Sequence, residues 1–242
     1  PRLLPAYAGL LLEREISVLS QMIKHPQRPL VVLLGGAKIF TKIGVIENFL
    51  KIADHILIGG AMANTFLKAQ GYGLGASAVE EEMVPVAKKL LNNKKLILPQ
   101  DVVVARDTET RKHGNTKTSE AKVIEINQKK TTICNQQSAI YDIGPQTIRA
   151  YAAHIRQAQT IIWNGPMGLF EISAFSHGSV ALARFIASRS KGKAFGVVGG
   201  AETLAVLAKT KMAEYVDHIS TGGGAMMDFL GRKKLPGIEA LK

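Results

Sequence analysis

Two lysines stand close behind a pair of glycines in the first fifth of the chain. The apolar run Leu30–Leu34 ends at Gly35 and Gly36, and Lys38 and Lys42 follow in the segment GGAKIFTK. A strand that passes through bare backbone into a helix start presents free N–H groups and the positive end of the helix dipole. Lysines four residues apart on that helix would face the same side. The pattern predicts a phosphate-binding site; the alternative is a tight turn with two solvated lysines.

Glycines follow four other apolar runs of the sequence. They stand in HILIGGAM, TIIWNGPMG, AFGVVGGAE and HISTGGGA, at Gly59, Gly60, Gly165, Gly168, Gly199, Gly200, Gly222, Gly223 and Gly224. The strands of an open parallel sheet end at one edge, and this edge is where ligands bind. One glycine turn is weak evidence, because such turns are common. Five of them predict a long cleft lined by backbone.

The composition is that of an ordinary globular protein. The chain has 242 residues, of which 46% are apolar, enough for one large or two small domains with a sizeable core. It contains no apolar run of the roughly 18 residues that a membrane span needs, and PRLLPAYAGL lacks a signal-peptide cleavage pattern. The single cysteine, Cys134, has no zinc-like spacing around it and is interpreted as a buried or incidental thiol. We therefore expect a cytoplasmic protein without a membrane partner.

The strongly basic charge first suggests nucleic acid. The formal net charge is +12, but the basic residues occur as scattered pairs, and 6% aromatic residues provide no stacking platform for single strands. The charge is better explained by a solvated face and a field that attracts small anions. We expect no nucleic-acid partner, and nucleic-acid binding stays as the weakest of three hypotheses.

Strand-like and helix-like segments alternate, which is typical of a mainly parallel α/β sheet. Strands are expected at Leu30–Leu34, His55–Ile58, Lys95–Leu98 with Val102–Val104, Thr160–Trp163, Ala194–Val198 and His218–Ile219. Helices are expected at Leu4–Lys24, Ile39–Ala53, Glu80–Asn92, Pro145–Gln157, Ala174–Ser188 and Glu202–Lys209. The polar stretch Asp107–Gln137 interrupts this rhythm, and its pieces Lys122–Ile126 and Thr131–Cys134 suggest a small hairpin. The prediction is a Rossmann-like, three-layer α/β domain with a small hairpin excursion.

Six motifs carry a resemblance to a known family. The segments GGAKIFTKIGVI, LPQDVVVA, DIGPQT, WNGPMGLFE, HISTGGGA and LPGIEALK occur in this order along the chain. Together they resemble phosphoglycerate kinase, and specifically its C-terminal, nucleotide-binding half. The resemblance implies that residues 1–242 are this domain, with residues 1–24 as the interdomain helix. The N-terminal substrate domain would then be absent, which would make the chain half an enzyme.

The resemblance also implies ligands and partners. ADP or ATP would bind with Mg²⁺, and the whole enzyme would transfer the acyl phosphate of 1,3-bisphosphoglycerate to ADP in glycolysis, which leaves 3-phosphoglycerate. The expected partner is the N-terminal domain of the same enzyme, and the expected state is a monomer that is inactive without that domain. The alternative is a non-catalytic nucleotide-binding or interaction module that retains the fold.

Roles for the first glycine turns follow from the resemblance. Lys38 would stabilise charge on the transferring phosphoryl group, and Lys42 would hold the nucleotide phosphates. Phosphoryl transfer requires this kind of positioning and charge neutralisation. Gly36, Gly59 and Gly60 would let adenine approach the backbone closely, because glycine has no Cβ.

The later turns receive roles in the same way. Asn164 and Pro166 would line the nucleotide site, and Glu171 would accept hydrogen bonds from the ribose hydroxyls. The alternative, from the local sequence alone, is that Glu171 is an acid at a helix N-terminus, where the helix dipole favours negative charge. Gly222 and Gly223 would help to stabilise the transferring phosphoryl group when the two domains close.

The chain departs from the family pattern at one turn. Three glycines and an aspartate are usual there, whereas this chain has Gly199, Gly200, Ala201, Glu202 and Thr203. Gly199, Gly200 and Thr203 would still contact nucleotide. Glu202 takes the place of the aspartate linked to magnesium and is one methylene longer. Magnesium requires octahedral geometry, so whether Glu202 ligates it as the aspartate would is an open question. Phe40 also differs from the small polar residue common at its position.

Overall fold

A six-stranded parallel sheet forms the centre of the computed structural model, which describes residues 5–106, 121–126 and 131–241. The strand order is β11-β10-β9-β1-β2-β4. The strands are β1 (Leu30–Leu34), β2 (His55–Ile58), β4 (Leu96–Ile97), β9 (Thr160–Asn164), β10 (Phe195–Gly199) and β11 (His218–Ser220). Each pair of neighbours is parallel, so all six strands end at the same edge. This confirms the expected α/β sheet and the shared edge of the glycine turns.

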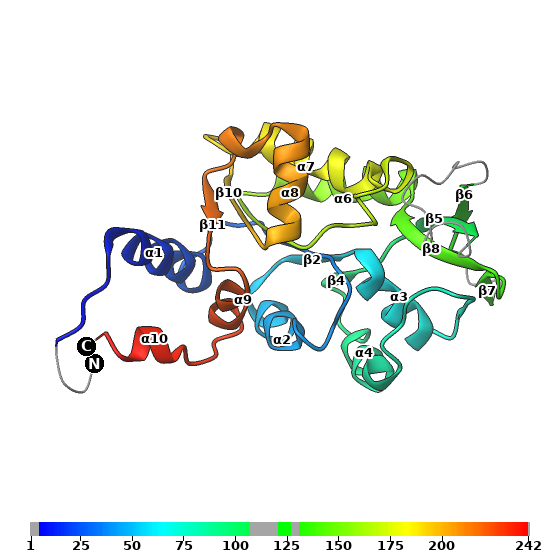
Figure 1. Ribbon diagram of the computed structural model, residues 1–242, viewed down its shortest axis with the longest axis horizontal. Helices are drawn as coiled ribbons and strands as arrows, with labels where there is room; N and C mark the ends of the chain where they lie inside the picture. Colours follow the sequence, from blue (N-terminus) through cyan, green and yellow to red (C-terminus); the bar gives the residue numbers. More distant parts are fainter. Residues whose placement is uncertain (1–4, 107–120, 127–130, 242) are drawn as a thin grey trace.

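Helices cover both faces of this sheet (Figure 1). Those described are α1 (Leu10–Lys24), α2 (Ile43–Ile52), α3 (Gly60–Ala69), α4 (Val84–Leu90), α6 (Pro145–Gln157), α7 (His177–Arg189), α8 (Ala201–Thr210), α9 (Gly224–Leu230) and α10 (Pro236–Glu239). One core cluster joins the sheet to α1, α2, α3, α4 and α9, and a second joins it to α6, α7 and α8. The expected three layers are therefore present.

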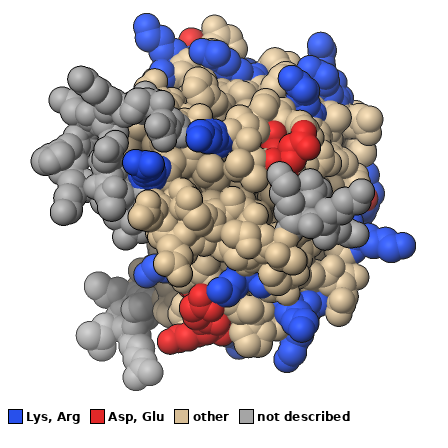
Figure 2. All heavy atoms as spheres, turned by 90° about the vertical axis from the view of Figure 1, so that its right-hand side faces the viewer, with Lys and Arg blue, Asp and Glu red and all other residues tan. Residues whose placement is uncertain are grey.

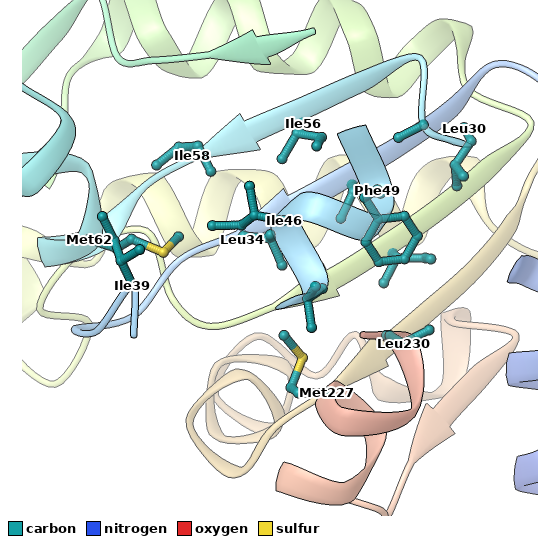
Figure 3. Packing of buried hydrophobic residues seen from close by; sticks show 14 of the residues in the cluster. Leu30, Leu34, Ile39, Ile46, Phe49, Ile56, Ile58, Met62, Met227 and Leu230 are labelled. Atoms are coloured by element: carbon teal, nitrogen blue, oxygen red, sulfur yellow. The ribbon is translucent and has the colours of Figure 1, made fainter. Parts of the chain in front are cut away.

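Strand β1 shows how the sequence builds two cores. All five residues of this strand are buried. Leu30, Val32 and Leu34 belong to the first cluster, whereas Val31 and Leu33 belong to the second. Successive strand side chains point to opposite faces, so a continuous apolar run is what a strand covered on both sides requires. Figure 3 shows Leu30 and Leu34 among the side chains of the first cluster.

A second, antiparallel sheet lies beside α3, at the end of the domain opposite α1 (Figure 1). Its order is β6-β5-β8, formed by β5 (Asp101–Arg106), β6 (Lys122–Glu125) and β8 (Ser138–Ile143). The expected excursion is confirmed, but its two pieces do not pair with each other. Strand β6 pairs with β5, and β7 (Thr132–Cys134) pairs with β3 (Gly73–Leu74). Residues 107–120 and 127–130 of the predicted excursion lie outside the described residues.

Several predicted helix boundaries were wrong. Helix α1 begins at Leu10 rather than Leu4, because Gly9 is extended at its N-cap; residues 1–4 lie outside the described part. Helix α2 begins at Ile43 rather than Ile39, after a series of turns. The predicted helices from Glu80 and Ala174 each divide into a short 3₁₀ turn and an α-helix.

Helix α3 and strand β8 are among the elements that the prediction missed, and two strands that it grouped together belong to different sheets. Helix α3 follows Gly59 directly and is buried continuously from Met62 to Leu67, so it lacks the exposed polar stripe that would mark a surface helix. Strand β8 begins directly after the stretch Asp107–Gln137 that was interpreted as polar, and no strand was predicted there. Strands β4 and β5 belong to different sheets, because Pro99 separates them.

Helix α6 is fixed to the smaller sheet by a buried carboxylate. It spans the predicted residues and has Pro145 in its first turn, where a missing N–H has no effect. Asp101 of β5 accepts hydrogen bonds from the backbone N–H of Gln146 at 2.9 Å and of Thr147 at 2.8 Å. These bonds satisfy N–H groups that a helix start leaves without partners. The smaller sheet is thereby joined to the layer of α6.

Basic side chains are spread over the molecular face shown in Figure 2 rather than gathered in one stripe. No helix in the described part of the chain is both long and apolar enough to cross a bilayer. Cys134 is buried, as its interpretation as a buried thiol requires, and burial raises the pKa of this thiol.

Candidate functional site

A cavity of about 570 Å³ opens at the carboxyl edge of the parallel sheet. Helix α3 forms one wall, β8 forms another, and the loop of residues 166–172 after β9 forms a third. Its lining is mostly apolar and contains three carboxylates, which belong to Asp142, Glu171 and Glu202. Such a cavity, apolar with a few polar groups, is typical of a small-molecule site.

Interlocked glycine turns form the end of the cavity nearest to β1. Gly36 N–H donates to Pro166 O at 2.8 Å, and Gly60 N–H donates to Met167 O at 2.9 Å. Gly36 has a φ of +86° and Gly60 a φ of +65°, a region that L side chains rarely adopt. A Cβ at Gly60 would lie 2.6 Å from the Gly36 nitrogen. Both glycines line the cavity as predicted, and close backbone packing requires them.

Gly59 packs the end of β2 against the loop that follows β9. It does not line the cavity, and a Cβ there would lie 2.2 Å from the Met167 sulfur. Its N–H donates to Leu34 O at 2.9 Å, which joins the end of β2 to the end of β1. Glycine at this position makes room for Met167, which is itself part of the cavity lining.

Lys42 lies behind the glycine turns rather than in the cavity. Its Nζ donates to Gly35 O at 2.5 Å and to Asn164 O at 3.3 Å, so the ammonium joins the ends of β1 and β9. Burial lowers the pKa of Lys42 to about 8, and the charge of Glu202 opposes that shift. A Cβ at Gly36 would lie 3.3 Å from Nζ, so the ammonium stands directly behind a residue of the cavity wall.

Lys38 is exposed and lies in the turns between Gly36 and α2. Its neighbour Ala37 lines the cavity, although Lys38 itself does not. The expectation that Lys38 and Lys42 share one helical face was wrong, because α2 begins after both of them. The loop between β1 and α2, and not a helix, positions the two lysines near the site.

Asn164 and Thr203 stabilise backbone in this structure. Asn164 Nδ2 donates to Gly199 O at 2.9 Å, and the Gly165 N–H donates to Thr203 Oγ1 at 2.7 Å. Both side chains are buried, and neither residue lines the cavity. They connect the ends of β9 and β10 and fix the turn that leads to Pro166, which lines the cavity as predicted.

The turn before α8 brings Glu202 to the cavity. Gly200 is the N-cap with a φ of +96°, and Glu202 follows in the first helical turn. Gly199 packs closely on Met226, since a Cβ would lie 2.1 Å from its sulfur. Neither glycine lines the cavity, whereas Glu202 and Glu171 do.

A magnesium ion that arrives with a nucleotide fits this arrangement. Within the described residues, no group of three or more His, Cys, Asp or Glu side chains could hold a metal by itself. Magnesium typically takes one or two carboxylates together with substrate phosphates, and Glu202 is such a carboxylate at the edge of the cavity.

Gly222 and Gly223 are not part of the cavity. They form the turn between β11 and α9, and Gly222 faces an apolar groove beside α1. Glu15 of α1 fixes this turn, because its carboxylate accepts hydrogen bonds from Thr221 N–H at 2.8 Å and Ser220 Oγ at 2.9 Å, with His218 Nε2 at 3.2 Å. Burial opposes ionisation, but these contacts outweigh it and lower the pKa of Glu15.

Asp142 is a cavity residue that the sequence did not single out. It is buried at the end of β8, and accepts hydrogen bonds from the N–H groups of Gly178 at 2.8 Å and Ile143 at 2.9 Å. Burial raises its pKa to about 7. A Cβ at Gly168 would lie 2.2 Å from its Oδ1. Its place before the strand-ending glycine in DIGPQT could have indicated a carboxylate at the sheet edge.

Comparison with known proteins identifies the family. The family model described as phosphoglycerate kinase matches residues 1–233. The chain belongs to the phosphoglycerate kinase family. It is 44% identical to the phosphoglycerate kinase of Moorella thermoacetica over 243 residues, which cover 98% of this chain and 58% of that protein. The phosphoglycerate kinase of Chloroflexus aggregans is also 44% identical, over 99% of this chain and 58% of its own length.

Solved phosphoglycerate kinase structures have the same fold. The structure from Coxiella burnetii has a TM-score of 0.85 at 41% identity, and the match covers 97% of this chain and 58% of that one. The structure from Pyrococcus horikoshii OT3 has a TM-score of 0.81 at 32% identity and covers 99% and 58%. The resemblance to the family is confirmed, and this chain spans a little over half the length of these phosphoglycerate kinases.

Proposed function

We propose that residues 1–242 form the nucleotide-binding domain of a phosphoglycerate kinase and bind ADP or ATP with Mg²⁺. The observation that carries this proposal is the cavity at the carboxyl edge of the sheet, bordered by Gly36, Gly60 and Glu202. An apolar slot of about 570 Å³ beside the loop that carries Lys38 suits a nucleotide, whose base is flat and apolar and whose phosphates need cations.

The residues would divide the work by position. The base and ribose would occupy the apolar part between α3 and the loop of residues 166–172, where Glu171 at the border could accept hydrogen bonds from ribose hydroxyls. The phosphates would lie toward Gly36 and Ala37, in reach of the exposed Lys38. Lys42 would contribute positive charge from behind the Gly36 turn.

Bound magnesium would neutralise part of the phosphate charge, and Glu202 would hold it. The lysines would add fixed positive charge, and the closed backbone turns would orient the phosphates. We propose that in the whole enzyme the acyl phosphate of 1,3-bisphosphoglycerate is transferred to ADP, with the substrate held by the family's other domain. Residues 1–24 would then include the interdomain helix.

Binding with and without phosphates tests this function. In calorimetry, ADP is expected to bind this chain and adenosine to bind more weakly. Lys38→Ala removes one charge-assisted contact of about 1.5–3 kcal/mol, so it should weaken ADP binding about ten- to a hundredfold and leave adenosine nearly unchanged. Lys94→Ala, at another exposed lysine outside the cavity, serves as the control for lost positive charge. Equal ADP affinity in wild type and Lys38→Ala would contradict the assignment of Lys38.

A further inference from the structure

The loop that carries Lys38 is held by a carboxylate from a distant part of the chain. Glu80, in the segment just before the 3₁₀ turn Glu81–Met83, accepts hydrogen bonds through Oε2 from the backbone N–H groups of Ile39 and Phe40. About forty residues separate the two segments in sequence. One carboxylate oxygen thus contacts the two residues that directly follow Lys38.

Glu80 itself is anchored to the wall of the cavity. Its N–H donates to Thr65 Oγ1 at 3.1 Å, and Asn64 Nδ2 donates to Ala78 O at 3.1 Å. Asn64 and Thr65 are buried residues of α3, and both Asn64 and Ala78 line the cavity. The carboxylate therefore extends from a segment whose position α3 fixes.

The same loop is held from the inside by Ile39. This side chain is fully buried and belongs to the first core cluster together with Met62 of α3. Figure 3 shows Ile39 and Met62 at the end of β1 and β2 that faces the site. With its side chain in the core and its N–H on Glu80, Ile39 has little freedom, whereas the neighbouring side chains of Lys38 and Phe40 are exposed. Nothing in the structure explains why residue 40 is aromatic.

We propose that Glu80 is a positioning residue for the nucleotide site: its carboxylate holds the loop of residues 36–42 so that Lys38 points to the phosphates of a nucleotide in the cavity. The proposal rests on the proposed function. Because the loop is already fixed, no conformational entropy of the loop is lost when the charge of Lys38 binds the phosphates. Glu80 would act through Lys38 and would not itself touch the nucleotide.

The direction of the effect separates positioning from simple charge. A carboxylate that merely lay near the phosphates would repel them, so its removal would strengthen ADP binding. A positioning role predicts that removal of the Glu80 carboxylate weakens ADP binding, because Lys38 is then no longer held in place. Glu82, exposed and two residues further along, provides a matched control in which the same charge is removed without contact to the loop.

The experiment compares ADP and adenosine affinities by calorimetry in wild type and in the Glu80→Ala, Glu80→Gln and Glu82→Gln variants. Glu80→Ala should weaken ADP binding about tenfold, and Glu80→Gln less, since its amide oxygen can still accept a hydrogen bond. Adenosine affinity should be unchanged in both variants. ADP affinity should be unchanged or slightly higher in Glu82→Gln. Because Glu80 acts through Lys38, Glu80→Ala should add little to the loss that Lys38→Ala already causes.

Amide hydrogen exchange of the nucleotide-free protein provides a second measurement. The amides of Ile39 and Phe40 should exchange faster in Glu80→Ala than in wild type, while Glu82→Gln should not change them. If the amides of Ile39 and Phe40 exchange at the same rate in Glu80→Ala and wild type, Glu80 does not hold the loop and the positioning role is overturned. If wild type binds ADP no better than adenosine, the proposed function fails. If wild type requires the phosphates but Glu80→Ala and Glu80→Gln bind ADP as well or better, the positioning role is overturned and the proposed function stands. Glu80→Gln, which keeps the size of the side chain, carries the test if Glu80→Ala does not fold.

Discussion

At the residue scale, Lys42 shows how a side chain expected at the phosphates can also serve the fold. Its ammonium bonds to the carbonyl oxygens of Gly35 and Asn164, which terminate two adjacent strands. Those carbonyls compensate part of the cost of burial, yet burial still lowers the pKa of Lys42 to about 8. A lysine that titrates in this range can report on a negative ligand placed beside it.

We expect ADP binding at pH 8 to take up protons through Lys42. Since its pKa is about 8, roughly half of the side chains are neutral in the free protein at that pH. Nearby phosphates would raise the pKa and protonate them. Calorimetry in buffers of different ionisation enthalpy should therefore give an uptake of up to about half a proton, smaller at pH 6.5, where Lys42 is already charged.

Lys42→Arg is the control for this measurement, because arginine remains charged throughout the range. The uptake at pH 8 should be absent in this variant. An equal uptake in Lys42→Arg and wild type would show that the protons go elsewhere.

Glu202 should matter for the metal complex and not for the free nucleotide. Glu202→Gln keeps the size of the side chain and removes its charge, so Mg-ADP binding should weaken about tenfold. Metal-free ADP should bind no more weakly, because a carboxylate beside bare phosphates repels them. Titrations of both ligand forms measure this, with Glu214→Gln as a control at another exposed helix-start glutamate.

The length of Glu202 is a separate question that Glu202→Asp addresses. A gain in Mg-ADP affinity would mean that the native glutamate is a compromised ligand, and a loss would mean that the turn is adapted to the longer side chain. If Glu202→Gln changes neither affinity, Glu202 is an ordinary acid at a helix start.

At the element scale, Asp142 joins β8 to the start of α7. Its carboxylate accepts the N–H of Gly178 in the first turn of that helix, where anions are favourable. Gly168 and Gly178 leave the space that it occupies, since a Cβ at either position would lie within 2.5 Å of Oδ1. The loop that borders the cavity is thus packed against a buried acid.

Asp142 should make stability depend on pH below neutrality. Burial raises its pKa from 3.8 to about 7 in the folded state, so between these values the folded protein binds a proton that the unfolded chain does not. This stabilising contribution is complete below about pH 4 and is lost as the pH rises to about 7. The amide introduced by Asp142→Asn does not titrate, so chemical denaturation should show this variant gaining stability relative to wild type between pH 5 and pH 8.

The free energy of unfolding of Asp142→Asn could instead fall relative to wild type as the pH rises, or differ from it by a constant amount. Either result would contradict a raised pKa of Asp142. The comparison needs no absolute stability, because the pH dependence of other groups cancels when the two proteins are measured together.

At the scale of the whole molecule, the chain spans 58% of its relatives' length. Residues 1–242 tested by themselves should show no measurable phosphoglycerate kinase turnover. One reactant would not be held, and the advantage of proximity, which reaches about 7–11 kcal/mol in favourable cases, would be lost. A coupled assay that consumes ATP with 3-phosphoglycerate checks this, and nucleotide binding confirms that the protein sample is folded.

The N-terminal domain of a relative, added as a separate chain, should restore a small activity that increases with its concentration. Robust turnover by residues 1–242 without it would overturn the proposal that the substrate-binding domain lies elsewhere. Nucleotide binding without any turnover in the mixture would favour the alternative of a non-catalytic module.

Much of the fold could be predicted because its signals are local. Strands β1 and β2 have the predicted bounds, since the runs LVVLL and ILI are apolar and each is followed by a glycine. Burial on both faces removes the alternation that would otherwise mark a strand, so length and flanking residues carry the prediction. The same strand-ending glycines predicted the edge where Gly36, Gly60 and Pro166 border the cavity.

Other features depended on contacts that no local pattern contains. The sequence by itself determined which residue types reach the sheet edge, because hydrophobic runs and glycines act through nearest neighbours. The tertiary structure decided what those residues do. Ile39 does not begin a helix, and its N–H is bound by Glu80, about forty positions away. Thr203 holds the Gly165 N–H, and Lys42 bonds to the carbonyl of Asn164. Each choice of partner depends on burial and distance between segments far apart in the chain, which exist only once the sheet has formed.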